Sequence, residues 1–262
     1  MRKKGQVALY LIIGLIILAI VMVVFYFKGE FFKSLFEKSA EESVLVPPQL
    51  MVVKNHIDNC FETTSNEGLL TIGNNGGYYK VPTDKSIIWF ADSVPYYYLN
   101  RENLVPSIKI IEKEYSSYIK DNIKSCLNFT EFVKIGYSIS SKSPLISTKI
   151  NNKTVDIIME YPITIKKLQT SVSLRYFKLR INSNVAALQK ASGDLVDSYS
   201  KKPGYVCLNC LEKISAKNNV SIDALPHQDP TIFENDIVWF LIDDTGYELN
   251  NKTLTLRFVV EQ

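Results

Sequence analysis

An uncharged apolar run of 21 residues extends from Val7 to Phe27. An α-helix of that length rises about 32 Å, which matches the roughly 30 Å hydrocarbon core of a membrane. Buried helices of globular domains seldom stay apolar on every side for so long. The run therefore predicts a single transmembrane helix.

The charges on either side of this run predict its orientation. Arg2, Lys3 and Lys4 precede it, whereas a group of mixed sign follows from Lys28 onward. The positive-inside rule then keeps the N-terminus in the cytoplasm and places the C-terminal part outside the plasma membrane. A cleaved secretory signal peptide would have a shorter apolar region and a small-x-small site after it. This run ends in Phe25-Tyr26-Phe27-Lys28 instead, so we expect the anchor to stay attached.

Four segments follow from the predicted anchor. Residues 1–6 form a basic cytoplasmic flank, 7–27 the transmembrane helix, 28–48 a juxtamembrane stalk, and 49–262 the exterior domain. Apolar residues recur at helical spacing in the stalk, which indicates either a continued membrane helix or an amphipathic helix at the interface. Pro47-Pro48 ends the stalk, because neither residue can continue a helix.

The charge balance of the exterior part excludes one class of partner. From Lys28 onward the chain has 27 Lys and Arg (30 minus the three at the N-terminus) and 27 Asp and Glu, a net charge of zero. A nucleic-acid-binding domain normally shows a basic electrostatic footprint. We therefore expect membrane lipid and other envelope proteins as partners, and no nucleic acid.

The residues Lys3-Lys4-Gly5-Gln6-Val7 resemble a class III signal peptide, the type found on archaeal type IV pilin-like proteins. The resemblance implies cleavage on the cytoplasmic side after Gly5, with Gln6 as the new N-terminus and the apolar helix retained. It also implies self-association through that helix. The family usually has Glu at the fifth mature position, which is Tyr10 here. The alternative is an uncleaved anchor with ordinary basic flanking residues.

The exterior part resembles surface proteins of small-genome archaea. The similarity rests on Cys60 within a helix, Gly76-Gly77-Tyr78 after it, the tract Val94-Pro95-Tyr96-Tyr97-Tyr98, and Cys126-Leu127-Asn128-Phe129 at the end of a second helix. This resemblance implies a compartment and a lineage, and it supplies no activity.

The apolar periodicity of the exterior part changes along the chain. Spacings of three and four predict helices, and strict alternation predicts strands. Helices that precede a mostly antiparallel sheet favour an α+β fold over a βαβ arrangement. The expected elements are helices near 49–72 and 108–126, strands near 86–90, 133–139, 155–165 and 172–181, a helix at 185–200, and strands near 220–224, 236–243 and 254–260.

Two details of the predicted sheet concern irregular strands. The apolar alternation changes face near Tyr176, which predicts a β-bulge there. Pro95 interrupts the aromatic tract Val94–Tyr98. Proline cannot donate to a ladder, so we expect this tract to be an edge strand or a loop whose tyrosines pack on a neighbouring helix.

Cys60 and Cys126 each fall on the apolar stripe of a predicted helix. In an oxidising exterior, two such helices packed antiparallel bring the thiols together, so we expect a disulfide. The alternative is two free thiols that pack as small apolar residues.

Cys207-Leu208-Asn209-Cys210 is a CxxC pair before a helix predicted over Leu211–Lys217. A local disulfide that staples a turn is the plainer interpretation. A CxxC at a helix N-terminus can also lower a thiol pKa and exchange disulfides. The thioredoxin-type arrangement needs a βαβ setting, however, and no parallel unit is predicted. Thiol–disulfide exchange therefore stays the minority hypothesis.

Other site chemistry is weakly indicated. His56 and Cys60 together with the CxxC pair make a Cys₃His set on paper, but exterior cysteines tend to oxidise. We expect neither a metal nor a cofactor. The carboxylate pairs Asp58/Glu62 and Asp243/Asp244 are expected to face solvent. Candidate glycosylation sequons begin at Asn128, Asn152, Asn219 and Asn251.

These features together predict a single-pass envelope protein with a large exterior domain. Its function is expected to be non-enzymatic, as a structural, adhesive or pilin-like component. The alternative is a membrane-tethered thiol–disulfide oxidoreductase that uses Cys207 and Cys210.

Overall fold

The computed structural model describes residues 16, 45–89, 92–202, 205–226 and 237–261. Its contacts divide the chain into two units, Met1–Leu45 and Val46–Gln262. The predicted transmembrane helix, apart from Ile16, and the predicted stalk up to residue 44 lie outside the described residues. The fold described below is therefore that of the second unit.

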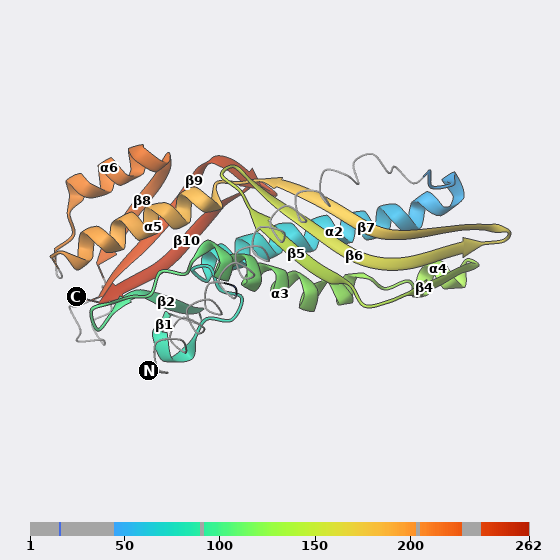
Figure 1. The fold of residues 1–262 in the computed structure, drawn as a ribbon, viewed down its shortest axis with the longest axis horizontal. Coiled ribbons are helices and arrows are strands. Elements are labelled where there is room, and N and C mark those ends of the chain that lie inside the picture. The colour runs from blue at the N-terminus through green and yellow to red at the C-terminus, as the bar shows by residue number, and fades with distance from the viewer. Residues whose placement is uncertain (1–15, 17–44, 90–91, 203–204, 227–236, 262) are drawn as a thin grey trace, which may run out of the picture. The chain divides into compact units, whose positions relative to one another are not determined.

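The second unit is an α+β fold, as predicted, and it contains two sheets (Figure 1). Its described helices are α2 (Pro48–Asn74), the 3-10 helix η1 (Thr83–Lys85), α3 (Ile108–Cys126), α4 (Thr130–Lys134), α5 (Val185–Ser200) and α6 (Leu208–Asn218). Its described strands are β1 (Ser86–Trp89), β2 (Asp92–Leu99), β3 (Glu102–Asn103), β4 (Tyr137–Ser141), β5 (Leu145–Ile150), β6 (Thr154–Lys167), β7 (Thr170–Asn182), β8 (Val220–Pro226), β9 (Ile237–Leu249) and β10 (Lys252–Glu261).

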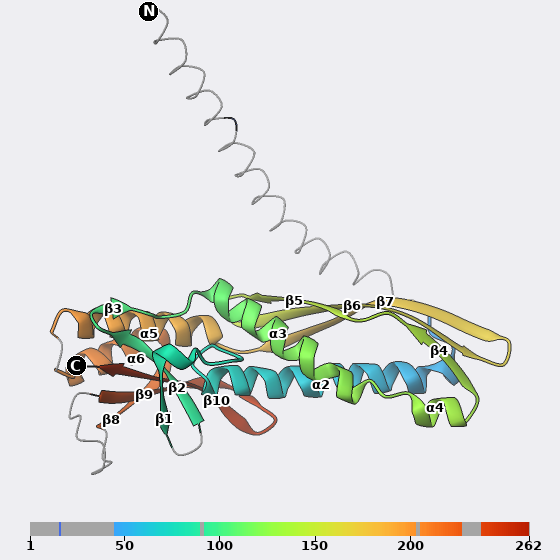
Figure 2. The ribbon, with the colours of Figure 1, turned by 90° about the horizontal axis from the view of Figure 1, so that it is seen from below.

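The long helix α2 connects the two sheets. With 27 residues it rises about 40 Å. It packs on β6 and β7 of one sheet and on β10 of the other (Figure 2). Val53, Ile57 and Cys60 are buried on the stripe predicted from their spacing. Pro48 stands in the first turn, where a helix tolerates proline because the missing N–H has no partner there in any case.

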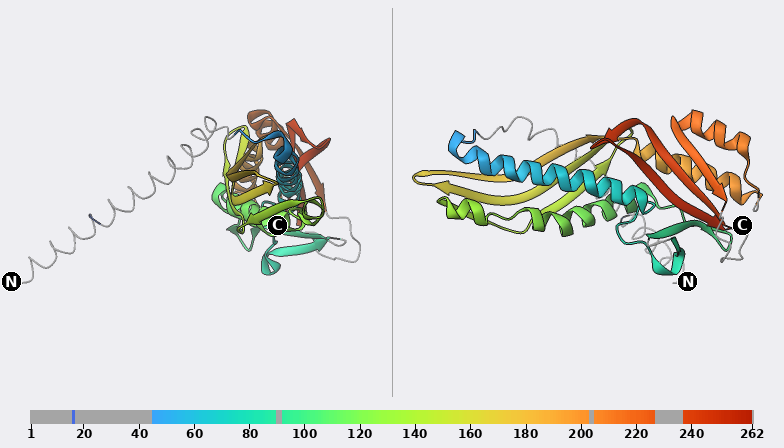
Figure 3. Two further views of the ribbon diagram at one scale, coloured as in Figure 1. Left: turned by 90° about the vertical axis from the view of Figure 1, so that its right-hand side faces the viewer. Right: turned by 180° about the vertical axis from the view of Figure 1, so that it is seen from behind.

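Helix α3 begins where the sequence predicts it. Ser107 caps its N-terminus, since the Ile110 N–H donates to the Ser107 hydroxyl at 3.4 Å. The predicted stripe is buried and faces α2 and β5, and its buried members are Ile111, Tyr115, Ile119 and Ile123. Helices α2 and α3 therefore lie side by side and cover one face of the first sheet (Figure 3).

The first sheet is antiparallel and is built around the 14-residue strand β6. Strand β7 pairs with its whole length, while β5 and β4 pair with its two halves along the other edge. The register between β6 and β7 shifts where Glu160 pairs with Tyr176 and Ile163 pairs with Leu174. A bulge near Tyr176 is thus confirmed, but its extra residue belongs to β6, beside Pro162.

The second sheet runs in the order β1-β2-β10-β9-β8, with β3 added to β2. Strands β2 and β10 are parallel, and the other neighbours are antiparallel. The expectation of an edge strand or loop at Pro95 was therefore wrong, since β2 lies inside the sheet. Proline is tolerated because the pairing with β10 begins only at Tyr96, one residue later. Tyr98 packs edge-on against Tyr199 of α5, as expected of this tract.

The strand predicted over 133–139 was also partly wrong. Residues Thr130–Lys134 form the short helix α4, and strand β4 starts only at Tyr137. Gly136, with φ at +91°, separates the two elements. Such a backbone angle is open to glycine and strained for other residues. The strand therefore does not extend back through Gly136, although the apolar alternation of the sequence does. Val133 and Ile135 are exposed as a result.

Helices α5 and α6 pack against each other and cover the second sheet (Figure 1). Helix α5 has the predicted bounds, and on β10 the predicted face of Leu254, Leu256, Phe258 and Val260 is buried. The larger hydrophobic core runs through both sheets and contacts the five α-helices that the structure describes, and a smaller separate cluster on the second sheet consists of Val94, Ile237, Trp239 and Val259.

Candidate functional site

The CxxC pair lies at the N-terminus of α6. Cys207 is the N-cap residue, and the Cys210 N–H donates to the Cys207 sulfur at 3.2 Å. The two cysteines form a disulfide with their Cα atoms 5.1 Å apart. The geometry is therefore that of a disulfide that staples the first turn of a helix, with its sulfur at the positive end of the helix dipole.

A shallow hollow borders this disulfide. Helix α5 contributes Leu195 and Tyr199 to its wall, and Phe240 comes from β9. Its volume is about 10 Å³, which is room for one water molecule rather than for a substrate. The described residues that line it supply no carboxylate, imidazole or amine. Among the described residues, the helix N-terminus is what would assist thiol chemistry here.

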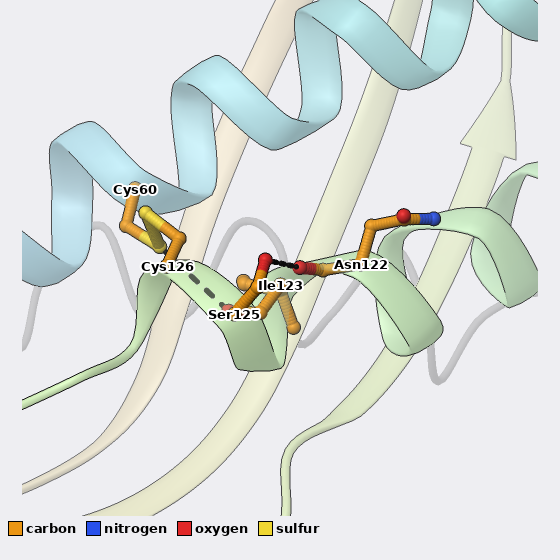
Figure 4. Close-up of a disulfide and its surroundings, with 5 residues drawn as sticks. All are labelled: Cys60, Asn122, Ile123, Ser125 and Cys126. Carbon is orange, nitrogen blue, oxygen red and sulfur yellow. Dashed lines mark hydrogen bonds between the residues drawn. A yellow bond between two sulfur atoms is a disulfide. The ribbon is translucent and has the colours of Figure 1, made fainter.

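The second disulfide joins Cys60 of α2 to Cys126 of α3, as predicted (Figure 4). Their Cα atoms are 5.7 Å apart, within the 4.4–6.8 Å range of disulfides. The Cys60 sulfur is buried and lies 3.8 Å from the carbonyl oxygen of Ile123. Cys126 is only partly buried, so the bond lies at the edge of the core with the Cys60 side covered.

The Cys₃His metal set is not assembled. Cys60 is bonded to Cys126 and Cys207 to Cys210, so no thiolate remains to hold a metal. The ring of His56 packs on Phe129 and on Phe132, at centroid distances of 5.9 and 5.2 Å. Within the described part of the chain, three or more metal-ligating side chains do not gather anywhere.

The two carboxylate pairs behave differently from each other. Asp58 and Glu62 are at least partly exposed, and Asp58 accepts a hydrogen bond from Lys54 at 2.5 Å. Asp244 is buried, contrary to the expectation that it faces solvent. Its carboxylate accepts hydrogen bonds from the backbone N–H and the side-chain amide of Asn184, both at 2.8 Å, and from Gly246 N–H at 2.9 Å. Asp244 therefore joins the start of α5 to strand β9 and has a structural role that the sequence did not reveal.

All four sequon asparagines are exposed, and each lies at a turn between elements. Asn128 lies just before α4 and its side chain accepts the Thr130 N–H, Asn152 lies in the β5–β6 turn, Asn219 is the C-cap residue of α6, and Asn251 lies in the β9–β10 turn. Asn219 and Asn251 have positive φ angles of 53° and 59°, which asparagine tolerates better than most residues. Their positions suit both a structural role and modification.

Several predicted features lie outside the described residues. They include the processing site at Gly5 and Gln6, Tyr10, and the span Val7–Phe27 apart from Ile16. None of the helices in the described part is long and apolar enough to cross a membrane.

Comparison with known proteins adds no assignment. No protein-family model matches the chain, and neither the curated proteins nor the solved structures searched contain a significant match. Function therefore has to be argued from the chain's own residues.

Proposed function

We propose that this chain is a single-pass membrane protein whose exterior domain acts through contacts with other envelope proteins, as a structural, adhesive or pilin-like component. The observation that carries the proposal is the pairing of all four cysteines in two disulfides. Disulfides persist in oxidising compartments and are rare in the cytosol. An exterior location agrees with the orientation that the basic flank predicts for the span Val7–Phe27.

The character of the domain surface supports protein contacts over catalysis. The hollow beside the partly buried CxxC disulfide holds about one water molecule. The four sequon asparagines are exposed at turns, where glycans would not disturb the packed core. A domain whose helices α2 and α3 are joined by a disulfide suits a mechanical or adhesive role at a cell surface.

Membrane fractionation tests the anchor. We expect the full chain to stay in the membrane pellet after alkaline carbonate extraction, and a variant that lacks residues 7–27 to be released. Thiol counting with a maleimide on the membrane-bound protein should find no free cysteine before reduction and four after it. A chain that is released by carbonate, or that has four free thiols when isolated, would contradict the proposal.

The pilin-like version of the proposal adds processing at Gly5 and association through the apolar helix. Intact mass spectrometry of the protein from its native membrane should then give a mass that starts at Gln6. A mass that includes Met1 or Arg2 would mean that the leader is not cleaved after Gly5, which would contradict the pilin-like version.

A second candidate function, thiol–disulfide exchange, is favoured by one observation. The Cys207 sulfur caps α6 and accepts the Cys210 N–H at 3.2 Å, so a thiolate at Cys207 would be stabilised by the helix N-terminus. This function predicts insulin reduction that is lost in Cys207→Ser and retained in the control Lys213→Met, an exposed position of the same helix. If the CxxC disulfide stays oxidised in the reductant of the insulin assay, thiol–disulfide exchange is excluded as the function.

A further inference from the structure

The turn between β6 and β7 has a residue that folding does not explain. Leu168 and Gln169 form the two-residue connection between the paired residues Lys167 and Thr170. Leu168 has a φ of 54° and is 96% exposed. Glycine or asparagine usually occupies a position with positive φ, because a bulky side chain is strained there. A fully exposed leucine in a strained turn position therefore suggests a ligand for its side chain.

Other exposed apolar residues lie at the same end of the first sheet. Tyr137 pairs with Lys167, so the residues just before β4 and the β6–β7 turn leave the sheet together. Val133 and Ile135, in and after α4, are 56% and 62% exposed. Figures 1 and 2 both show α4 and the β6–β7 turn at this end. We call it the hairpin end, defined by residues 133–136 and 166–169.

The polypeptide enters the second unit beside the hairpin end. In the first turn of α2, the side-chain amide of Gln49 donates to the Thr170 hydroxyl at 2.7 Å. The Tyr137 hydroxyl donates to the Gln49 carbonyl oxygen, also at 2.7 Å. The next turn of α2 exposes Met51 and Val52. The start of the domain is therefore fastened to the base of the β6–β7 hairpin.

The hairpin end and α4 are basic within an exterior part that is neutral as a whole. Residues 130–137 and 164–170 contain Lys134, Lys166 and Lys167 against the single acid Glu131, a net charge of 3 − 1 = +2. Lys166 is exposed. The Lys167 ammonium lies 4.1 Å from the centre of the Tyr137 ring. Lysines interspersed with exposed aliphatic side chains are the composition of surfaces that bind the interface of a membrane.

We propose that the hairpin end is a lipid-contacting surface, with Leu168 and Ile135 entering the interfacial layer and Lys166 and Lys167 facing lipid phosphates. The inference rests on the proposed membrane anchor. Only residues 28–45 separate the end of the predicted span from Val46, where the second unit begins. The chain enters the second unit at this end, and the lysines there suit anionic lipid headgroups, which favours lipid over a second protein as the occupant.

A fluorescent probe in the full chain tests the contact. The native cysteines are paired, so a cysteine introduced as Leu168→Cys takes an environment-sensitive dye alone. Asn251→Cys is the matched control, because it lies in an exposed two-residue turn with positive φ in the other sheet. Both proteins are reconstituted into vesicles with and without anionic lipid, and with lipids that carry a quencher near the headgroup.

We expect a blue shift and lipid-dependent quenching of the dye at position 168, strongest with anionic lipid, and neither effect at position 251. A dye at 168 that behaves like the dye at 251 would overturn the inference. So would a dye that is shifted but escapes the lipid quencher, since protein would then cover the surface. If the chain fails to float with vesicles, both the proposed anchor and the lipid contact are contradicted. If the chain floats but the dye at 168 stays exposed to water, only the lipid contact is contradicted.

A second variant separates lipid contact from folding. Asparagine suits the positive φ of the turn, so Leu168→Asn should leave the thermal midpoint unchanged or raise it. A dye on Ile135→Cys should nevertheless lose quenching when Leu168→Asn or the pair Lys166→Gln and Lys167→Gln is added. Undiminished quenching in both combinations would contradict a role for these side chains.

Discussion

Cys60, at the midpoint of α2, is bonded to Cys126, the last residue of α3, with their Cα atoms 5.7 Å apart. The two cysteines are 66 positions apart in the chain, and the strands β1, β2 and β3 and most of α3 lie between them. The bond therefore links the helix pair on the first sheet and encloses three strands of the second. Its loss should affect the whole domain.

Removal of this disulfide is expected to be far more costly than removal of the CxxC disulfide. The chain-entropy model gives roughly 4 kcal/mol for Cys60→Ala with Cys126→Ala, and roughly 1.5 kcal/mol for Cys207→Ala with Cys210→Ala, whose separation is 3. Urea unfolding of a fragment of residues 46–262 measures both values. Equal losses in the two double variants would show that the Cys60–Cys126 disulfide does not hold the fold in this way.

Asp244 and its neighbour Asp243 provide a matched pair. Asp244→Ala leaves the buried Asn184 amide groups without an acceptor, so we expect a loss of about 2–3 kcal/mol in unfolding free energy. Asp243→Ala removes the bond that the Thr255 hydroxyl donates at a partly exposed site, at a cost of about 1 kcal/mol or less. Denaturant titrations that rank the two variants in the opposite order would refute a structural role for Asp244.

Two helical glycines should respond oppositely to alanine. A Cβ at Gly73 would lie 2.5 Å from the Thr255 carbonyl oxygen of β10, so Gly73→Ala should cost about 1–3 kcal/mol. A Cβ at Gly193 would meet nothing within 4 Å, so Gly193→Ala should stabilise α5 by up to about 1 kcal/mol. Thermal midpoints of the two variants check the prediction. A stable Gly73→Ala protein would mean that α2 does not approach β10 this closely.

The contact between α5 and α6 should weaken in acid. The Lys217 ammonium donates to the Asp194 carboxylate at 2.9 Å and lowers the pKa of Asp194 below its ordinary value of 3.8. A lowered pKa in the folded state means that the stabilisation is present above pH 3.8 and is lost as the pH falls through the lowered pKa. The pair is exposed, so its contribution is less than about 1 kcal/mol.

The variant Lys217→Met tests this contact. It should flatten the dependence of unfolding free energy on pH below 3.8, whereas Lys213→Met, an exposed lysine of the same helix, should leave it unchanged. If both variants gave the same acid profile as the unchanged chain, the pair would have no role in stability.

Local signals explain why most of the fold could be predicted. Helix α5 has its predicted bounds, α3 starts after the Pro106-Ser107 signal, and the alternation on β6 predicts a strand whose inner face is buried. Helix α4 was missed because four alternating apolar residues look like a strand, and only the positive φ of Gly136 reveals the break. The parallel pairing of β2 with β10 joins residues more than 160 positions apart, which no local pattern encodes.

Both disulfides were predicted from the sequence, whereas the buried contacts of Asp244 were not. The pairing of Cys60 with Cys126 followed from two apolar stripes, since each stripe had to face the same core. The burial of Asp244 could not be foreseen, because its partner Asn184 lies 60 residues away in sequence. The exposure and positive φ of Leu168 likewise depend on which residues form the β6–β7 turn, and apolar alternation alone does not locate that turn.

Labelling of intact cells with a membrane-impermeant maleimide tests whether the chain is anchored with its domain outside the cell. The reporter is Asn251→Cys, at an exposed turn, and the unchanged chain with its four paired cysteines is the control. We predict that the reporter is labelled in intact cells and that the control is not. Labelling of Asn251→Cys only after the cells are lysed would place the domain in the cytoplasm and contradict the account.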